Sequence, residues 1–261
     1  MPPLFPQLAT GALCHFPIRK LRTLRSVTNA TADGRSIRLA DPAGGTTIWR
    51  LEYVELTDDE AAALGQFFAQ AEGSLNGFTF VDPTANLLSR SANLGDAMWA
   101  REPMLAAASG MEDPAGGTNA WRLSNSGSAA QSISQTPAAP GDYTYCLSAY
   151  ARAATAGAIT ATVGARSAER RVSASWKRIT FTATGDSGAA ATRFGIEIPA
   201  GSTVDLYGIQ AEAQAGASAY RNTETGGVFD GARFLNDSLE IVTTGVNRHS
   251  CSLYITHADH L

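Results

Sequence analysis

Hydrophobic and polar residues alternate in the stretch that begins at Trp49. Trp49, Leu51 and Tyr53 fall on every second position, which predicts a strand with one face against a core. The pattern FTF at residues 78–80 predicts another strand, which ends before Pro83 because proline cannot donate a hydrogen bond to a sheet.

Between these two strands the pattern predicts an amphipathic helix over residues 58–72. Thr57 and Glu60 have the spacing of a capping box, and Gly73 follows where a left-handed residue commonly ends a helix. Apolar side chains recur at spacings of three and four along one stripe, namely at Ala61, Leu64, Phe67, Phe68 and Ala71. We expect this stripe to be buried against the N-terminal sheet.

The middle of the chain has the composition of a sandwich of short strands. Gly, Ala, Ser and Thr crowd residues 106–205, where runs such as ITATV, WKRITFTAT and RFGIEI alternate with turn residues. With 261 residues, of which 44% are hydrophobic, the chain can bury a core in each of two domains. The predicted fold class is therefore mainly β.

The C-terminal segment predicts a hairpin, with strands at residues 238–243 and 250–256. A two-stranded hairpin is marginal by itself, so it needs a larger sheet to join. We therefore predict a discontinuous β domain from residues 1–83 together with 227–261. Residues 86–223 would form a second domain inserted into it.

The N-terminal patterns W-R-L-x-Y, L-T-x-x-E-x-x-x-L-x-x-F-F and G-F-T-F-x-D-P resemble the first module of distal tail proteins from tailed phages and phage-like particles. The resemblance covers residues 1–83. It implies a β-rich structural protein with one short helix that assembles as a ring, commonly a hexamer, between tail tube and tail tip. The implied partners are the tail tube protein and tail hub proteins. The implied location is the baseplate region of the virion, after assembly in the bacterial cytoplasm.

The segments NLLSRSANLGDAMWARE, YTYCLSAYAR and VDLYGIQAEAQAGASAYRNTET resemble the jelly-roll, carbohydrate-binding-module-like domains of phage tail and receptor-binding proteins. In such domains the opening N-L-L and the closing segments, here Tyr207 to Glu212 and Tyr220 to Thr223, lie near each other. The resemblance implies an inserted jelly roll, with host surface glycans as its candidate ligand. The alternative is a free carbohydrate-binding module or an accessory protein of glycan processing.

Charge limits the partners that the chain can have. A net charge of −4 argues against a general nucleic-acid surface, which would need dense positive charge. The basic cluster of Arg19, Lys20, Arg22 and Arg25 is the exception, and we interpret it as a solvated strand face or a subunit contact rather than a polyanion site. Arg19, Arg22 and Arg25 are the candidate interface residues. No apolar run reaches membrane-spanning length, so we expect no membrane insertion.

The sequence contains no recognisable catalytic constellation. It has no G-x-S-x-G, no H-E-x-x-H and no glycine-rich phosphate loop, and none of its histidines has the context of a base beside a nucleophile. We therefore expect a protein without enzymatic activity. Cys14, Cys146 and Cys251 are too far apart for a metal site, and we expect them to be buried as small hydrophobic residues.

Two kinds of ligand site can be proposed from residue types. Trp121 and Tyr143 are the glycan-binding candidates, because an exposed aromatic ring can stack on a sugar. Asn86, Asp205 and Glu212 could supply oxygen ligands to a structural calcium ion, otherwise no cofactor is expected. The alternative is that Asn86 serves as a turn residue and Asp205 is simply exposed.

Overall fold

A computed structural model describes residues 4–258, apart from the side chains of residues 42 and 43. Contacts divide the chain into two compact units: unit 1 contains residues up to 9, 14–80 and those from 229 on, and unit 2 contains residues 10–13 and 81–228.

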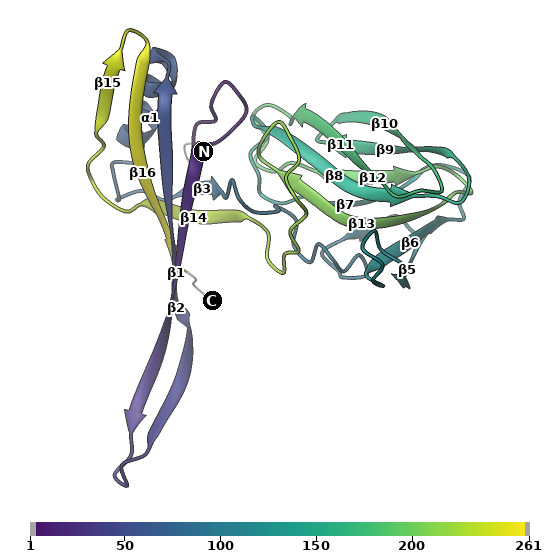
Figure 1. The fold of residues 1–261 in the computed structure, drawn as a ribbon, viewed down its shortest axis with the longest axis horizontal. Helices are drawn as coiled ribbons and strands as arrows, with labels where there is room; N and C mark the ends of the chain where they lie inside the picture. Colours follow the sequence, from purple (N-terminus) through teal and green to yellow (C-terminus); the bar gives the residue numbers. More distant parts are fainter. Residues whose placement is uncertain (1–3, 259–261) are drawn as a thin grey trace. The chain divides into compact units, whose positions relative to one another are not determined.

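Unit 1 contains the helix and six strands in one sheet, of order β1-β2-β16-β14-β3, with β15 paired to β16 (Figure 1). The elements are β1 (His15–Ala30), β2 (Ser36–Leu56), α1 (Asp58–Gln70), β3 (Phe78–Val81), β14 (Val228–Phe234), β15 (Ile241–Gly245) and β16 (Arg248–Ala258). β16 runs antiparallel to β2, with Ile255 opposite Trp49 and Leu253 opposite Leu51. The C-terminal hairpin thus joins the N-terminal sheet. A two-stranded hairpin is only marginally stable by itself, which is why it needs the larger sheet.

The helix begins at Asp58 as its sequence predicts, but it ends at Gln70, two residues before the predicted end. The Thr57 hydroxyl accepts a hydrogen bond from the Glu60 backbone at 3.2 Å, and the Glu60 carboxylate accepts one from the Thr57 backbone at 3.0 Å, so the capping box is confirmed. Gly73 has φ of +62°, the left-handed conformation expected after a helix.

The apolar stripe of α1 packs into a cluster of aromatic rings. The Phe67 ring lies 4.9 Å from that of Phe78 and 5.3 Å from that of Phe5, mostly in edge-to-face arrangements. Leu64 and Phe67 are buried as predicted. Phe68 is only partly buried, and the centroid of its ring lies 4.9 Å from that of Phe234. The helix is therefore held against the sheet mainly by Leu64 and Phe67.

The first two strands extend beyond the rest of the sheet as a long hairpin, which the sequence did not predict. β1 and β2 pair as far as Ala30 and Ser36, whereas the pairing of β2 with the described part of β16 ends at Thr46 (Figure 1). We call residues 19–47 the arm, and the remainder of unit 1 the body. Residues 24–45 of the arm pair only with each other among the described residues.

Unit 2 is an antiparallel β-sandwich, which confirms the predicted fold class. One sheet has the order β10-β9-β12-β7-β4 and the other the order β11-β8-β13-β6-β5. Tyr145 from one sheet meets Phe194 from the other at 5.2 Å, and both side chains are buried. The strands are β4 (Ala100–Arg101), β5 (Leu105–Met111), β6 (Ala120–Asn125), β7 (Gln131–Gln135), β8 (Thr144–Arg152), β9 (Gly157–Val163), β10 (Arg166–Val172), β11 (Lys177–Thr184), β12 (Phe194–Ile198) and β13 (Thr203–Glu212).

Two further sequence features can be compared with the described residues. Cys14, Cys146 and Cys251 are buried, as predicted. Within residues 4–258, no helix has the length and apolar character that crossing a membrane requires.

Truncation of Phe67 tests the aromatic cluster. We expect Phe67→Ala to lower the free energy of unfolding by about 3 to 5 kcal/mol, because it removes a buried ring and leaves a cavity. Gln66→Ala, on the exposed side of the same helix, is the matched control. Urea denaturation measures both, and equal midpoints for the two variants would show that the ring does not support the fold.

Candidate functional site

A hollow of about 430 Å³ opens on unit 2 where loops meet the sheet that contains β6 and β13. Three aromatic side chains line it, Trp121 from β6, Tyr207 from β13 and Tyr220 from the segment after β13. Three asparagines also line it, at positions 93, 119 and 222. Aromatic faces beside amide groups are the common composition of a site for a small polar ligand with apolar faces.

Trp121 is held in place from two sides. Its indole nitrogen donates a hydrogen bond to the Ala92 carbonyl at 2.9 Å. A Cβ atom at Gly95 would lie 2.8 Å from Cη2 of the ring, so residue 95 must lack a side chain for the indole to take this position. The ring remains partly exposed. The structure therefore places the candidate Trp121 at an accessible hollow with a fixed orientation.

Tyr207 and Tyr220 form a pair beside Trp121. Their ring centroids are 5.3 Å apart at an interplanar angle of 66°. Gly208, at φ of +63°, allows this contact, because a Cβ atom there would approach the Tyr220 ring to 3.0 Å. Burial raises the pKa of both hydroxyl groups, and the charge of Asp113 raises the pKa of Tyr207 further. Both tyrosines therefore keep their protons at neutral pH and can donate hydrogen bonds.

The three asparagines supply both donors and acceptors. The side-chain carbonyl of Asn93 accepts from the Gly95 backbone at 3.1 Å, which leaves its amino group for a ligand. Asn222 is held through its carbonyl by the Ser91 hydroxyl at 3.4 Å. Asn119 is held the other way round, because its amino group donates to Asp113 at 2.9 Å and leaves its carbonyl open. Such a mixed set suits hydroxyl groups, which both donate and accept.

Buried Asn86 joins the beginning of unit 2 to its end. Its amino group donates to the Ile209 carbonyl at 2.9 Å, and its carbonyl accepts from the backbones of Leu88 and Ala211, each at 3.1 Å. The Thr223 hydroxyl donates to the Leu88 carbonyl at 2.6 Å. The opening and closing segments thus lie together, and they position Tyr220 and Asn222 at the hollow.

The calcium candidates have protein partners. Asn86 is bonded as described above, and Glu212 accepts from the Ser218 backbone at 3.0 Å. Asp205 accepts from Arg122 at 2.8 Å and from Arg152 at 3.1 Å. Burial raises the pKa of Asp205, but these bonds outweigh that effect and the pKa lies below its ordinary value. Over residues 4–258 no group of three or more His, Cys, Asp or Glu side chains could hold a metal ion. Calcium binding remains a prediction without a ligand cluster among these side chains.

The second glycan candidate must be corrected. Tyr143 is only 3% exposed, and its ring lies 6.0 Å from that of buried Tyr145. Neither ring offers a face to a ligand. The alternation in YTYCLSAY is that of a strand covered on both sides, and this pattern argued against Tyr143 as a ligand contact. Trp99 is 4% exposed as well, and its indole nitrogen donates to the Arg90 carbonyl at 3.1 Å.

Tyr207 and Tyr220 were not among the ligand candidates from the sequence. Both lie in the closing segments that carry the jelly-roll resemblance, so the signal was present. The sequence does not show that the two rings meet. Gly208 has no side chain, and this lets Tyr220 pack beside Tyr207, although one residue lies on a loop and the other on a strand.

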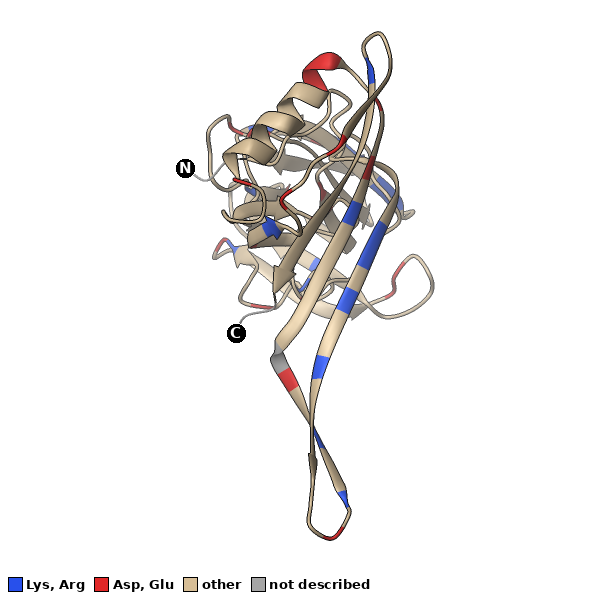
Figure 2. Cartoon of the chain, turned by 90° about the vertical axis from the view of Figure 1, so that its left-hand side faces the viewer, with Lys and Arg blue, Asp and Glu red and all other residues tan. Residues whose placement is uncertain are grey.

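The three candidate interface arginines lie elsewhere, on β1 in unit 1. Arg19, Arg22 and Arg25 are exposed, which agrees with a solvated strand face. Lysine and arginine are spaced along both strands of this hairpin (Figure 2). Arg25 pairs with Asp41 on the neighbouring strand, with Nε to Oδ2 at 2.6 Å.

The hollow's lining contains no histidine and no carboxylate. His15, His249 and His257 belong to unit 1, and His260 lies outside the described residues. The lining therefore offers aromatic faces, hydroxyl groups and amides, which hold a ligand by stacking and hydrogen bonds.

No family model and no curated protein matches the chain. Among solved structures it is similar to the CBM22-1 xylan-binding domain of Paenibacillus barcinonensis Xyn10C, at 15% identity and a TM-score of 0.41 over 53% of this chain and 97% of that one. The enzymatically active domain of bacteriophage CBA120 tailspike protein 4 matches at 14% identity and a TM-score of 0.40, over 50% of this chain and 22% of that one. TmCBM61 in complex with β-1,4-galactotriose matches at 14% identity and a TM-score of 0.36, over 48% and 97%. These values are too low to carry an argument about function.

Replacement of Asn86 distinguishes a hydrogen-bonding role from metal ligation. Asn86→Ala leaves two backbone N–H groups and a carbonyl without their partner, at a cost of about 1 to 3 kcal/mol for each buried group that stays unsatisfied. We expect a large fall in melting temperature from this variant and none from Asn93→Ala. EDTA should leave the melting temperature of the natural protein unchanged. A fall on chelation that added calcium reverses would establish a metal site instead.

Proposed function

We propose that the protein binds saccharides through the hollow on unit 2. The observation that carries this proposal is the combination of Trp121, Tyr207 and Tyr220 with three asparagines in one hollow of about 430 Å³. A pyranose has an apolar C–H face that packs on an aromatic ring, and a rim of hydroxyl groups that exchange hydrogen bonds with amides. The hollow offers groups for both kinds of contact, aromatic rings and side-chain amides.

The charge of the surroundings favours a neutral ligand. No charged side chain lines the hollow. Asp113, which accepts a hydrogen bond from the lining residue Asn119, adds a negative charge beside the lining, which disfavours an anionic ligand. Arg122 and Arg152, on the same sheet, pair with Asp205, and Arg152 also pairs with Glu112. We therefore propose a neutral oligosaccharide of a cell surface as the ligand, bound without being cleaved.

Truncation of Trp121 tests the proposal. The natural protein is screened against an array of bacterial surface polysaccharides, and the best ligand is then measured by titration calorimetry. We expect Trp121→Ala to weaken binding at least about tenfold, which corresponds to about 1.4 kcal/mol. Tyr254→Ala, in unit 1, is the control and should bind as the natural protein does. Failure of every glycan on the array to bind, or equal affinity of Trp121→Ala, would contradict saccharide binding at this hollow.

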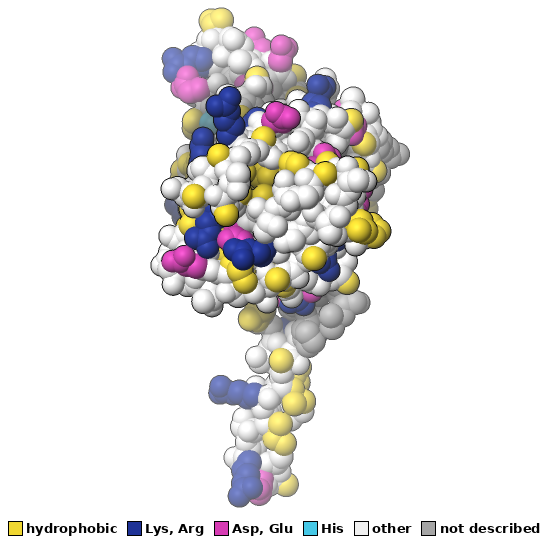
Figure 3. Space-filling view, turned by 90° about the vertical axis from the view of Figure 1, so that its right-hand side faces the viewer, with side chains coloured by type: hydrophobic (Ala, Val, Ile, Leu, Met, Phe, Trp, Pro, Cys, Tyr) yellow, Lys and Arg dark blue, Asp and Glu magenta, His cyan; other side chains and the backbone are white. Residues whose placement is uncertain are grey.

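A second candidate function is structural, and the arm favours it. Among the described residues, both outer edges of residues 24–45 lack a pairing strand. Exposed apolar side chains occur on this hairpin, where Val27 lies opposite Leu39 and Ile37 lies opposite Asn29, and the three apolar residues are 42%, 52% and 49% exposed in that order. Figure 3 shows hydrophobic side chains along one side of the arm. Open strand edges with an apolar face promote association with another chain.

We infer that copies associate through the arm into a closed ring, the role that the resemblance to distal tail proteins implies. A hexameric ring between tail tube and tail hub proteins, at the tip of a phage-like tail, would present several copies of unit 2. In that setting the saccharide ligand would be a glycan of the host surface.

Removal of the arm tests the structural function. Thr23 lies opposite Thr46, so replacing residues 24–45 by Asn-Gly closes the hairpin with a two-residue turn. We expect the natural protein to give the mass of an oligomer in light scattering and the shortened protein to give that of a monomer. Saccharide binding at a single site should survive the deletion. A natural protein that stays monomeric at high concentration would contradict the ring.

A further inference from the structure

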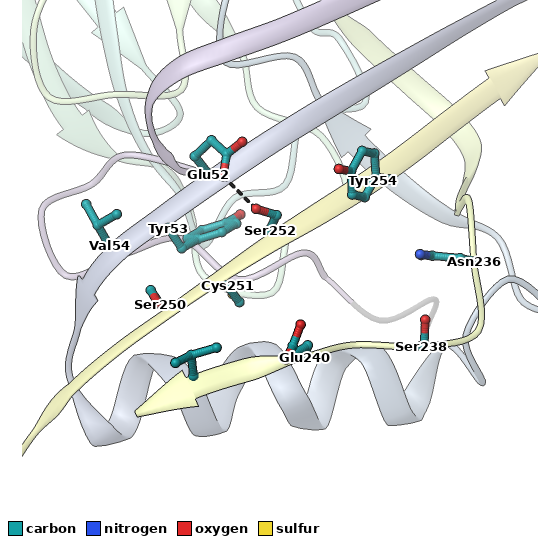
Figure 4. A pocket seen from close by; sticks show the side chains of 11 residues that line it. Glu52, Tyr53, Val54, Asn236, Ser238, Glu240, Ser250, Cys251, Ser252 and Tyr254 are labelled. Atoms are coloured by element: carbon teal, nitrogen blue, oxygen red, sulfur yellow. Dashed lines mark hydrogen bonds between the residues drawn. The ribbon is translucent and has the colours of Figure 1, made fainter. Parts of the chain in front are cut away.

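The body of unit 1 contains a second hollow, of about 540 Å³, on the face of β2 and β16 beside the segment that leads into β15. Figure 4 shows Glu52, Ser252 and Tyr254 on the two long strands, and Glu240 on that segment. Val54 and Val242 line the hollow and are about half exposed, at 51% and 48%. The hollow thus combines apolar walls with two carboxylates. We call it the acidic hollow.

The two carboxylates differ in their present partners. Glu52 contacts Arg50, with Nε to Oε1 at 2.6 Å, and accepts from the Ser252 hydroxyl at 2.6 Å. Glu240 is exposed and has no hydrogen bond or ion pair with any described residue. A cation that entered the hollow would therefore find Glu240 available.

Charge is segregated between the arm and the body. The arm has six basic residues, Arg19, Lys20, Arg22, Arg25, Arg35 and Arg38, against the two acidic residues Asp33 and Asp41. The described part of the body has the basic residues Arg50, Arg233 and Arg248 against nine acidic ones, at positions 52, 55, 58, 59, 60, 72, 230, 237 and 240. Arm-to-arm contact therefore brings like charges together, whereas arm-to-body contact brings opposite charges together.

The arm has a segment that matches the acidic hollow in chemistry. Leu21 and Leu24 are exposed, at 60% and 73%, and they alternate with Arg22 and Arg25 in the run LRTLR. Exposed leucines with guanidinium groups on either side fit half-exposed valines with carboxylates beside them. Arginine suits a fixed contact of this kind, because its planar group can bond a carboxylate through two donors.

The segment cannot reach the acidic hollow of its own chain. Leu21, the end of the segment nearest the hollow, lies opposite Ile48, which is four residues from Glu52 at the hollow on the same strand. At about 3.3 Å per residue, this separates them by about 13 Å along β2, and the pairing of β1 with β2 holds the segment at that distance. The matching segment must therefore come from another copy.

We propose that residues 21–25 of one copy dock in the acidic hollow of the next, so that successive copies meet through two different surfaces. Such a head-to-tail contact can close into a ring, whereas an arm-to-arm contact of two copies would be self-complementary. The inference rests on the structural function proposed above and names the surface that receives the arm.

Charge and apolar variants test the two sides of the contact. We expect Glu240→Lys and Val242→Asp each to weaken association at least tenfold in sedimentation velocity over a range of concentrations. The matched controls are Glu169→Lys, an exposed acid of unit 2, and Val246→Asp, which is 97% exposed and does not line the hollow. Circular dichroism should show that all four variants fold.

Mixing separates a head-to-tail contact from an arm-to-arm contact. The double variant Arg22→Glu, Arg25→Glu has an altered arm and an intact hollow, and Glu240→Lys has the reverse. We expect each alone to be monomeric, and an equimolar mixture to form a heterodimer through the one intact pair of surfaces. Assembly of Glu240→Lys and Val242→Asp at natural strength would overturn the acidic hollow as the acceptor, while the ring function would stand. A monomeric natural protein would overturn both.

Discussion

The pairing of β2 with β16 is the interaction on which unit 1 depends. It joins residues as far apart in sequence as Glu52 and Ser252, 200 positions from each other. Without β16 the sheet would lose the strand between β2 and β14, and the aromatic cluster under α1 would lose one of its walls. Contacts of such long sequence separation are costly in chain entropy and slow to form. Unit 1 therefore depends on some feature that holds its N-terminal and C-terminal segments close to each other.

Hydrogen bonds within unit 2 hold these two segments close to each other. The backbone N–H of Asp82 donates to the backbone carbonyl of Gly227 at 2.8 Å, and the backbone N–H of Gly227 donates to the backbone carbonyl of Asn86 at 3.0 Å. These bonds hold the entering and leaving strands of the inserted sequence next to each other. A folded unit 2 thus acts as a short connection between β3 and β14, although it contains well over half of the chain. The entropy of closing unit 1 is reduced accordingly.

The sequence predicted those parts of the fold that depend on residues close together in the chain. The capping box at Thr57, the strand at Phe78 and the burial of Phe67 follow from spacing alone, and all three are confirmed. The length of the arm could not be predicted, because a hairpin that faces water on both sides has no buried positions to show a period. Tyr143 was assigned wrongly and Tyr220 was missed for a related reason. Exposure of an aromatic ring depends on what other segments place over it, and a single strand does not encode that.

The hydrogen bonds at Gly227 and Asn86 also make unit 2 exchangeable. Its ends are joined by its own backbone, so residues 81–228 connect to unit 1 through two chain connections that lie next to each other, and residues 10–13 complete the unit. Another domain whose ends lie equally close could occupy the same position without altering β3 or β14. Recombination at the two positions of the gene that encode these ends would therefore exchange the proposed saccharide site and leave the sheet of unit 1 unchanged.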